Sequence, residues 1–139
     1  YKTAKKYISN AIRDHNIKYL PLMRTIRLVR LIVFYEVQEH ELIQYESRSI
    51  TRSLSSPKEQ TFKTERIILW FLNKRNIPIL KKDREAFWEK LSPEIHELYN
   101  NKYESQLLRL FDFTAWMESK IRKEKLSEVL RARSSAKEC

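Results

Sequence analysis

Arginine side chains at helical spacing are the residues of this sequence that could do chemistry. Some recur every third residue and others lie four apart within apolar segments, and the set is Arg24, Arg27, Arg30, Arg48, Arg52 and Arg66. A guanidinium engages a carboxylate or a phosphate through two parallel hydrogen bonds, which a lysine cannot do. If equivalent helices line one surface, these arginines form an anion-binding strip. The alternative is a solvated face on which Glu36, Glu46 and Glu65 supply ion pairs.

The acidic residues around His40 are the nearest approach to a metal site. Glu36, Glu39 and Glu41 flank this imidazole at a helix end, and imidazole with carboxylates can bind zinc. A carboxylate-bridged di-metal site would repeat a Glu-x-x-His pair on other helices. Here Val37 stands three residues before His40, and no second copy exists. We therefore expect a solvated elbow with no metal and no cofactor.

Nucleophilic catalysis has no support in this sequence. The chain contains no glycine, which excludes the phosphate-binding loops and nucleophile elbows built on that residue. Its single cysteine is the last residue, Cys139. We expect His15, beside Asp14, at a helix end and His96, after Glu94, on a helix exterior. Because no cysteine, histidine and aspartate group together, we expect that the protein is not an enzyme.

Aromatic residues are the other candidates for binding. Trp70, Trp88 and Trp116 each fall within an amphipathic segment, so we expect them to pack in the core or between helices. Stacking on nucleic-acid bases would instead need exposed aromatics interleaved with basic residues. Three dipeptides have that composition: Tyr1-Lys2, Lys6-Tyr7 and Lys18-Tyr19.

The charge of the chain favours an anionic partner. With 28 basic and 18 acidic residues the net charge is +10, which attracts acidic proteins, anionic lipid surfaces or nucleic acid. Carboxylates are interleaved with the basic residues, so we expect only weak nucleic-acid binding that is lost at physiological ionic strength. The longest strongly apolar run, residues 31–35, is too short to span a bilayer. A lone cysteine fits a reducing, cytoplasmic compartment.

Seven segments with helical hydrophobic periodicity must position these side chains. They cover residues 2–16, 20–38, 41–54, 57–76, 80–100, 103–123 and 127–133. The apolar arc of residues 20–38 is wide enough to require more than one packing neighbour. In the next segment we expect Leu42, Tyr45 and Ile50 to face the core, with Ser47 and Ser49 at close helix contacts.

Polar residues and prolines mark the ends of several of these segments. Ser56, Pro57 and Glu59 have the spacing of a capping box. Ser92-Pro93 predicts either a kink within one helix or the cap of a second, and Asn100-Asn101 predicts a helix end.

The segments together predict an all-α chain. Helix content should exceed about 65%, because the missing turn glycines argue against hairpins and sheets. Short connections predict antiparallel helical hairpins stacked as a short α-solenoid of six to seven helices. We expect one domain over residues 1–133, followed by a polar tail at 134–139. Because the sequence opens with mid-helix character, we interpret it as the C-terminal part of a longer protein.

Two stretches resemble known helical repeats. Residues 26–36 are rich in large apolar side chains, and after a short elbow residues 41–49 begin with Glu-Leu-Ile. This pair resembles a tetratricopeptide-type unit, although the family's small residue would fall near Val37-Gln38. Together with residues 111–121, the chain is similar to the C-terminal end of helical-repeat proteins of the Bacteroidetes group, whose function is not established. The resemblance implies a concave groove that binds partner peptides, and it carries over no catalytic residue.

We therefore expect a protein–protein interaction scaffold that binds an acidic protein or peptide segment. Two alternatives remain open. One is a nucleic-acid-binding helical domain, which the charge favours, although the long paired helices include no obvious short recognition helix. The other is a purely structural cap that covers the last hydrophobic face of the solenoid.

Overall fold

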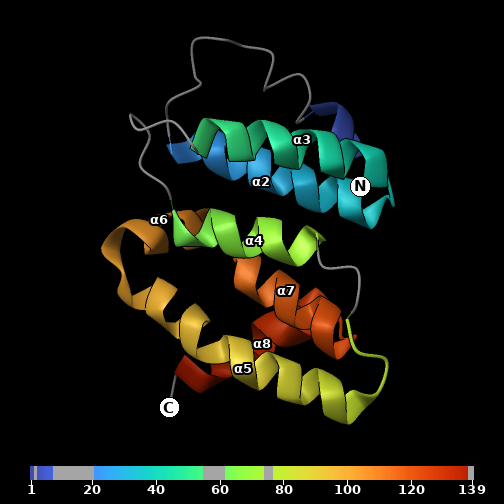
Figure 1. Ribbon diagram of the computed structural model, residues 1–139. Coiled ribbons are helices and arrows are strands. Elements are labelled where there is room, and N and C mark those ends of the chain that lie inside the picture. Colours follow the sequence, from blue (N-terminus) through green and yellow to red (C-terminus); the bar gives the residue numbers. More distant parts are fainter. Residues whose placement is uncertain (2, 8–20, 55–61, 74–76, 138–139) are drawn as a thin grey trace. The chain divides into compact units, whose positions relative to one another are not determined.

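The computed structural model describes residues 1, 3–7, 21–54, 62–73 and 77–137 (Figure 1). Helices make up 86% of these residues, and none of them lies in a strand. The prediction of an all-α chain is confirmed. The described ranges contain eight helices, including a short one at residues 3–7, where the sequence predicted six or seven. The helices divide between two compact units, Tyr1–Asn73 (unit 1) and Lys74–Cys139 (unit 2).

Unit 1 is built on a helical hairpin. Helices α2 (Pro21–Glu36) and α3 (His40–Leu54) lie side by side and antiparallel, and α4 (Lys63–Asn73) packs against both (Figure 1). The wide apolar arc of α2 contacts both neighbours, as its sequence predicts. The buried residues of α2 include Leu28, Leu31, Ile32, Val33 and Phe34.

The elbow between α2 and α3 closes without glycine. Gln38 adopts a left-handed conformation with φ of 59°, which costs a residue with a Cβ atom about 1 kcal/mol. In return, the backbone N–H of Gln38 bonds to the carbonyl of Tyr35 at 3.1 Å, and that of Glu39 bonds to the carbonyl of Phe34 at 2.9 Å. These bonds satisfy carbonyl groups that the end of a helix leaves unpaired.

The start of α4 differs from the sequence prediction. Ser56, Pro57 and Glu59 lie outside the described residues, whereas Phe62 is not helical and α4 begins at Lys63. The carboxylate of Glu65 accepts a hydrogen bond from the backbone N–H of Phe62 at 3.4 Å. A glutamate at the third helical position thus satisfies an amide at the helix start, as in one half of a capping box.

Helix α7 (Phe113–Arg122) lies at the centre of unit 2. It packs against α5 (Lys81–Asn100) and α8 (Leu126–Lys137), while α6 (Lys102–Leu110) packs on α5. Every residue from Phe113 to Ser119 is buried, and so is Ile121. Helix α8 continues through residues 134–137, which the sequence pattern placed in a polar tail. This is compatible with helix because the hydroxyls of Ser134 and Ser135 bond to carbonyls one turn earlier.

The single helix expected over residues 103–123 is two helices, so that prediction was wrong. Phe111 is extended, with φ of −154° and ψ of 127°, and Asp112 is the N-cap of α7. Its carboxylate accepts a hydrogen bond from the backbone N–H of Ala115 at 2.9 Å. Aspartate stabilises a helix start in this way and competes with continuation of the preceding helix.

The positions of Pro93 and Asn101 agree with two of the sequence predictions. Pro93 lies inside α5, which remains one helix. Asn101 ends α5 and caps α6, since its side chain accepts hydrogen bonds from the backbone N–H groups of Tyr103 and Glu104 at 2.9 and 3.3 Å.

Candidate functional site

The arginines of α2 are tied to acidic residues within unit 1. Arg24 forms a two-pronged pair with Glu65 of α4, with Nε–Oε1 and Nη2–Oε2 distances of 2.8 and 2.6 Å. Glu65 is only 3% exposed, and the guanidinium also lies 4.7 Å from the centre of the Phe62 ring. A buried bidentate pair of this kind fixes the position of one helix against another.

Arg27 and Arg30 share one buried carboxylate on α3. Glu46 is 6% exposed and lies 3.4 Å from Arg27 and 3.6 Å from Arg30. The Arg30 guanidinium additionally faces the ring of Phe34 at 5.1 Å. The three arginines of α2 therefore join α2 to α3 and α4 through two buried carboxylates, Glu46 and Glu65.

The arginines of α3 point the other way. Arg48 and Arg52 are exposed, and neither is ion-paired to a residue that the structure describes. With Tyr45 and Ser49 they line a cavity of about 360 Å³ on the outer side of α3. The four residues follow the i, i+3, i+4, i+7 spacing that brings side chains onto one face of a helix over two turns.

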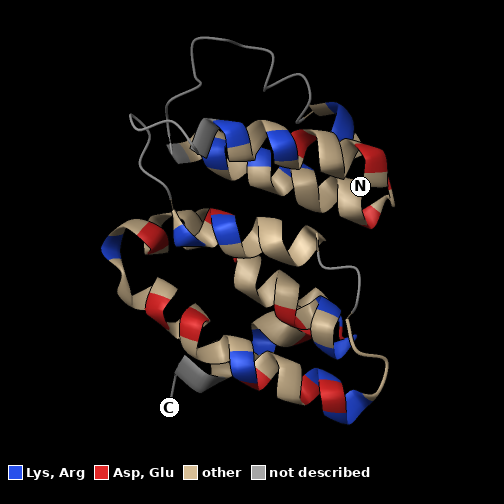
Figure 2. Cartoon of the chain, in the orientation of Figure 1, with Lys and Arg blue, Asp and Glu red and all other residues tan. Residues whose placement is uncertain are grey.

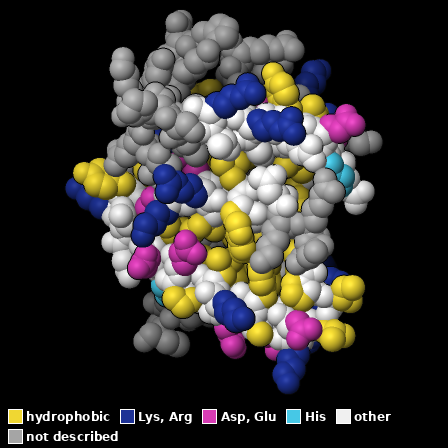
Figure 3. Space-filling view, viewed as in Figure 1, with side chains coloured by type: hydrophobic (Ala, Val, Ile, Leu, Met, Phe, Trp, Pro, Cys, Tyr) yellow, Lys and Arg dark blue, Asp and Glu magenta, His cyan; other side chains and the backbone are white. Residues whose placement is uncertain are grey.

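Arg66 of α4 adds a third exposed arginine to unit 1. We call the set Tyr45, Arg48, Ser49, Arg52 and Arg66 the outer basic face. The ribbons of α3 and α4 carry Lys and Arg positions (Figure 2), and Lys and Arg side chains stand out on the face of unit 1 that is turned to the viewer in the space-filling view (Figure 3).

This face is positive because its arginine side chains are exposed while two carboxylates of the same helices, Glu46 and Glu65, point inward. The carboxylates of Glu46 and Glu65 turn inward and are 6% and 3% exposed, so they are held by the arginines of α2 and do not screen the surface. Glu41 is exposed on α3 about two turns before Arg48, but it forms no ion pair with Arg48 or Arg52, so these arginines keep a positive field that attracts anions. The outer basic face can therefore bind carboxylates or phosphates.

Ser49 connects the inner ion pairs to the outer cavity. Its Oγ accepts a hydrogen bond from Nη2 of Arg27 at 3.3 Å, while the same residue lines the cavity with Arg48 and Arg52. The guanidinium of Arg27 is thus hydrogen-bonded to one of the residues that line the cavity.

The structure divides the six arginines predicted to bind an anion into two groups. Arg24, Arg27 and Arg30 lie in inter-helix pairs, whereas Arg48 and Arg52 line the cavity on α3 and Arg66 is exposed on α4. Sequence reasoning missed Tyr45, which it placed in the core with Leu42, although these side chains are 74% and 38% exposed. Among residues 40–52 of α3, Ile43, Glu46, Ser47 and Ile50 are buried. The available signal was the spacing of Tyr45 three residues before Arg48, which puts both on one face.

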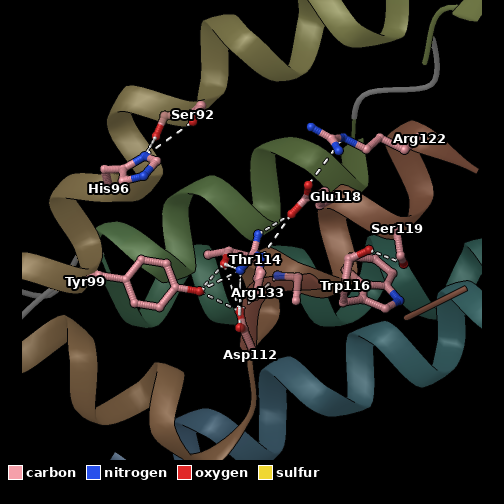
Figure 4. Close-up of polar contacts among 11 residues, drawn as sticks. Ser92, His96, Tyr99, Asp112, Thr114, Trp116, Glu118, Ser119, Arg122 and Arg133 are labelled. Atoms are coloured by element: carbon pink, nitrogen blue, oxygen red, sulfur yellow. Dashed lines mark hydrogen bonds and ion pairs between the residues drawn. The ribbon is translucent and has the colours of Figure 1, made fainter. Parts of the chain in front are cut away.

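A second polar cluster lies within unit 2 around Arg133 of α8 (Figure 4). Its Nη1 donates to the hydroxyls of Tyr99 and Thr114, each at 2.8 Å, and lies 3.2 Å from Oδ2 of Asp112. Its Nη2 donates to Oε2 of Glu118 at 2.6 Å. One side chain of α8 is therefore bonded to α5, to α7 and to the residue that caps α7.

The electrostatics of this cluster are those of a closed structural network. Burial raises the pKa of Tyr99 to about 12, and the nearby Asp112 carboxylate acts in the same direction. Burial by itself lowers the pKa of Arg133, but the bond to Glu118 and the charges of its neighbours outweigh it and raise the pKa overall. The donors and acceptors of the cluster bond to one another, so the cluster is suited to holding α8 against α5 and α7 and not to binding a ligand.

The remaining candidate residues are scattered. Trp88 and Trp116 are 7% and 1% exposed, as expected of core residues, but Trp70 is 44% exposed. His40 and His96 are exposed, whereas His15 and Cys139 lie outside the described residues. Within the described ranges, no three His, Cys, Asp or Glu side chains are grouped so that they could hold a metal ion.

Two further observations bear on the class of protein. None of the helices in the described part of the chain combines the length and the apolar character that crossing a membrane requires. Comparison with known proteins returned no match: no family model fits the sequence, and no curated protein and no solved structure is similar to it. The function therefore has to be inferred from the chemistry of the exposed residues.

Proposed function

We propose that this chain is a binding module that engages an acidic segment of a partner protein through the outer basic face. One observation carries the proposal. Arg48 and Arg52 line an open cavity and have no ion-pair partner among the described residues, while Glu46 of α3 and Glu65 of α4 are held inside by α2. A partner that supplies carboxylates would provide the compensation that unit 1 lacks.

The size of the face favours a short acidic segment over a nucleic-acid track. Arg48 and Arg52 are separated by about 6 Å along the helix axis, a distance that one or two acidic side chains can cover. Nucleic-acid binding at physiological salt rests on many phosphate contacts, each of which releases counterions. The three arginines of the outer basic face would supply few such contacts.

The proposed context is a helical-repeat scaffold. In this interpretation the α2–α3 hairpin is one tetratricopeptide-like unit of an α-solenoid, whose neighbouring units extend the binding surface. The resemblance of residues 26–49 to such a unit supports the interpretation. A structural cap is the competing role, and it predicts no ligand for the outer basic face.

The test is a binding titration with an acidic peptide of about ten residues at several salt concentrations around ~150 mM. We expect the affinity to fall as salt rises and to fall at least about tenfold in the variant Arg48→Glu/Arg52→Glu, because the attraction becomes repulsion. The matched control is Lys102→Glu/Arg109→Glu on α6, which changes the charge equally at exposed positions of unit 2. It should bind as the unmodified chain does.

Two results would overturn the proposal. Equal affinities of the charge-reversed and control variants would show that the outer basic face is not the site. Submicromolar binding of labelled DNA or RNA at the same salt, without binding of the peptide, would assign the face to nucleic acid.

A further inference from the structure

The cavity on α3 is lined by hydrogen-bond donors. Arg48 and Arg52 offer guanidinium N–H groups, and Tyr45 and Ser49 offer hydroxyls. No carboxylate belongs to this lining among the described residues. We propose that the cavity takes a phosphate monoester, namely the phosphoryl group of a phosphorylated serine or threonine in the partner segment; this inference rests on the acidic-segment function proposed above.

The hydroxyl of Ser49 is the specific feature of the cavity. On the same helix the Thr51 hydroxyl donates to the carbonyl of Ser47 one turn earlier, at 2.8 Å, and Ser134 and Ser135 of α8 do the same at 3.0 and 3.1 Å. Ser49 departs from this pattern, because its oxygen accepts a hydrogen bond from Arg27. Its hydrogen has no acceptor among the residues that the structure describes, so it can donate into the cavity.

The number and charge of the donors favour a phosphoryl group over a carboxylate. Two arginines one turn apart on a helix have Cβ atoms about 5–6 Å apart, so their guanidinium groups can meet over one anion. A phosphate monoester carries a charge of about −1.5 to −2 and presents three acceptor oxygens. A carboxylate has one charge and two oxygens, and would leave part of this donor set unused.

The experiment compares two peptides of equal net charge. One contains phosphoserine in an acidic sequence, and the other replaces it by two glutamates so that the net charges match. Fluorescence anisotropy with the full chain should show the phosphopeptide binding at least about tenfold more tightly, since hydrogen bonds to charged groups contribute on that order. The substitution Ser49→Ala should remove this preference, so that the phosphopeptide and the glutamate peptide then bind about equally. Ser135→Ala, at an exposed helical serine of α8, should have no effect on either peptide.

A second variant tests the geometry of the arginines. Arg48→Lys keeps the charge and loses the planar fork, so it should reduce the affinity for the phosphopeptide several-fold more than that for the glutamate peptide. An equal reduction for both peptides would indicate that charge alone is recognised and would count against the phosphoryl site.

The outcomes separate this inference from the function on which it rests. Equal affinities for the two peptides would overturn the phosphoryl site and leave the acidic-segment function standing. Absence of binding by both peptides would overturn both. Displacement of the phosphopeptide by an equal concentration of a nucleoside monophosphate would identify a nucleotide as the ligand and overturn the assignment to a peptide.

Discussion

Replacing Arg133 by alanine should loosen α8 from the rest of unit 2. The guanidinium bonds to Glu118 at 2.6 Å, to Asp112 at 3.2 Å and to the hydroxyls of Tyr99 and Thr114. Removing one member of a fully buried ion pair costs about 3–5 kcal/mol, because the other charge is left without compensation. The side chains of Arg133 and Glu118 are 23% and 11% exposed, so burial is incomplete.

A second ion-pair partner of Glu118 reduces the loss of stability that we expect in this variant. Arg122 lies 3.3 Å from the same carboxylate and stays in place in the variant. We therefore expect Arg133→Ala to lower the free energy of unfolding by about 2 kcal/mol. Adding Glu118→Gln should recover part of this loss, because the buried charge is then removed as well.

The assay is urea unfolding followed by circular dichroism, together with hydrogen exchange of the α8 amides. The matched control is Arg131→Ala, which removes an exposed arginine from the same helix and should change stability by less than about 0.5 kcal/mol. Amide protection in α8 should fall in the Arg133 variant alone. If both variants have the same stability and the same protection, the cluster around Arg133 does not hold α8.

Three further predictions concern single positions. Gln38→Gly should raise the free energy of unfolding by about 0.5–1 kcal/mol, because residue 38 has a left-handed φ of 59° that glycine adopts without strain; a thermal or urea melt that shows a loss would contradict this. Burial raises the pKa of Tyr99 to about 12 from 10.0, so the folded state holds that proton longer than the unfolded state and loses stability as pH rises from 10.0 towards about 12. Tyr99→Phe should therefore show a shallower decline than the unmodified chain over this pH range and the same dependence below it, in parallel urea titrations; identical slopes would count against the shift. Asp112→Ala should cost about 1 kcal/mol or more in a urea melt, since the N-cap of α7 is lost, and an unchanged midpoint would mean that Asp112 does not cap the helix.

The sequence predicted the elements that depend on local periodicity and capping. The range of α2 was correct to within two residues at its end, and Asn101 was identified as a helix end from its own chemistry. The division at Asp112 was missed because residues 103–123 keep a helical hydrophobic period through it. The Asp112 carboxylate caps α7 without changing that period, so Asp112 itself was the one sequence feature that could have indicated the division.

The candidate site was harder to predict because it depends on which carboxylate meets which arginine. Arg27 and Arg48 both lie within amphipathic helices, yet one pairs with Glu46 and the other is exposed. The difference arises from the register of α2 against α3, which periodicity alone does not set. The exposure of Tyr45 follows from the same packing, since Ile43, Glu46 and Ile50 take the buried positions.

The central claim is that the inner arginines hold unit 1 together and the outer ones bind its partner. The most direct measurement compares Arg24→Ala with Arg48→Ala/Arg52→Ala in both urea unfolding and acidic-peptide binding. We predict that Arg24→Ala lowers stability by about 2 kcal/mol or more, because Glu65 is left buried, while the folded fraction still binds the peptide. The double variant should keep its stability to within about 0.5 kcal/mol and lose at least about tenfold in affinity. A double variant that binds the peptide as tightly as the unmodified chain would contradict the claim.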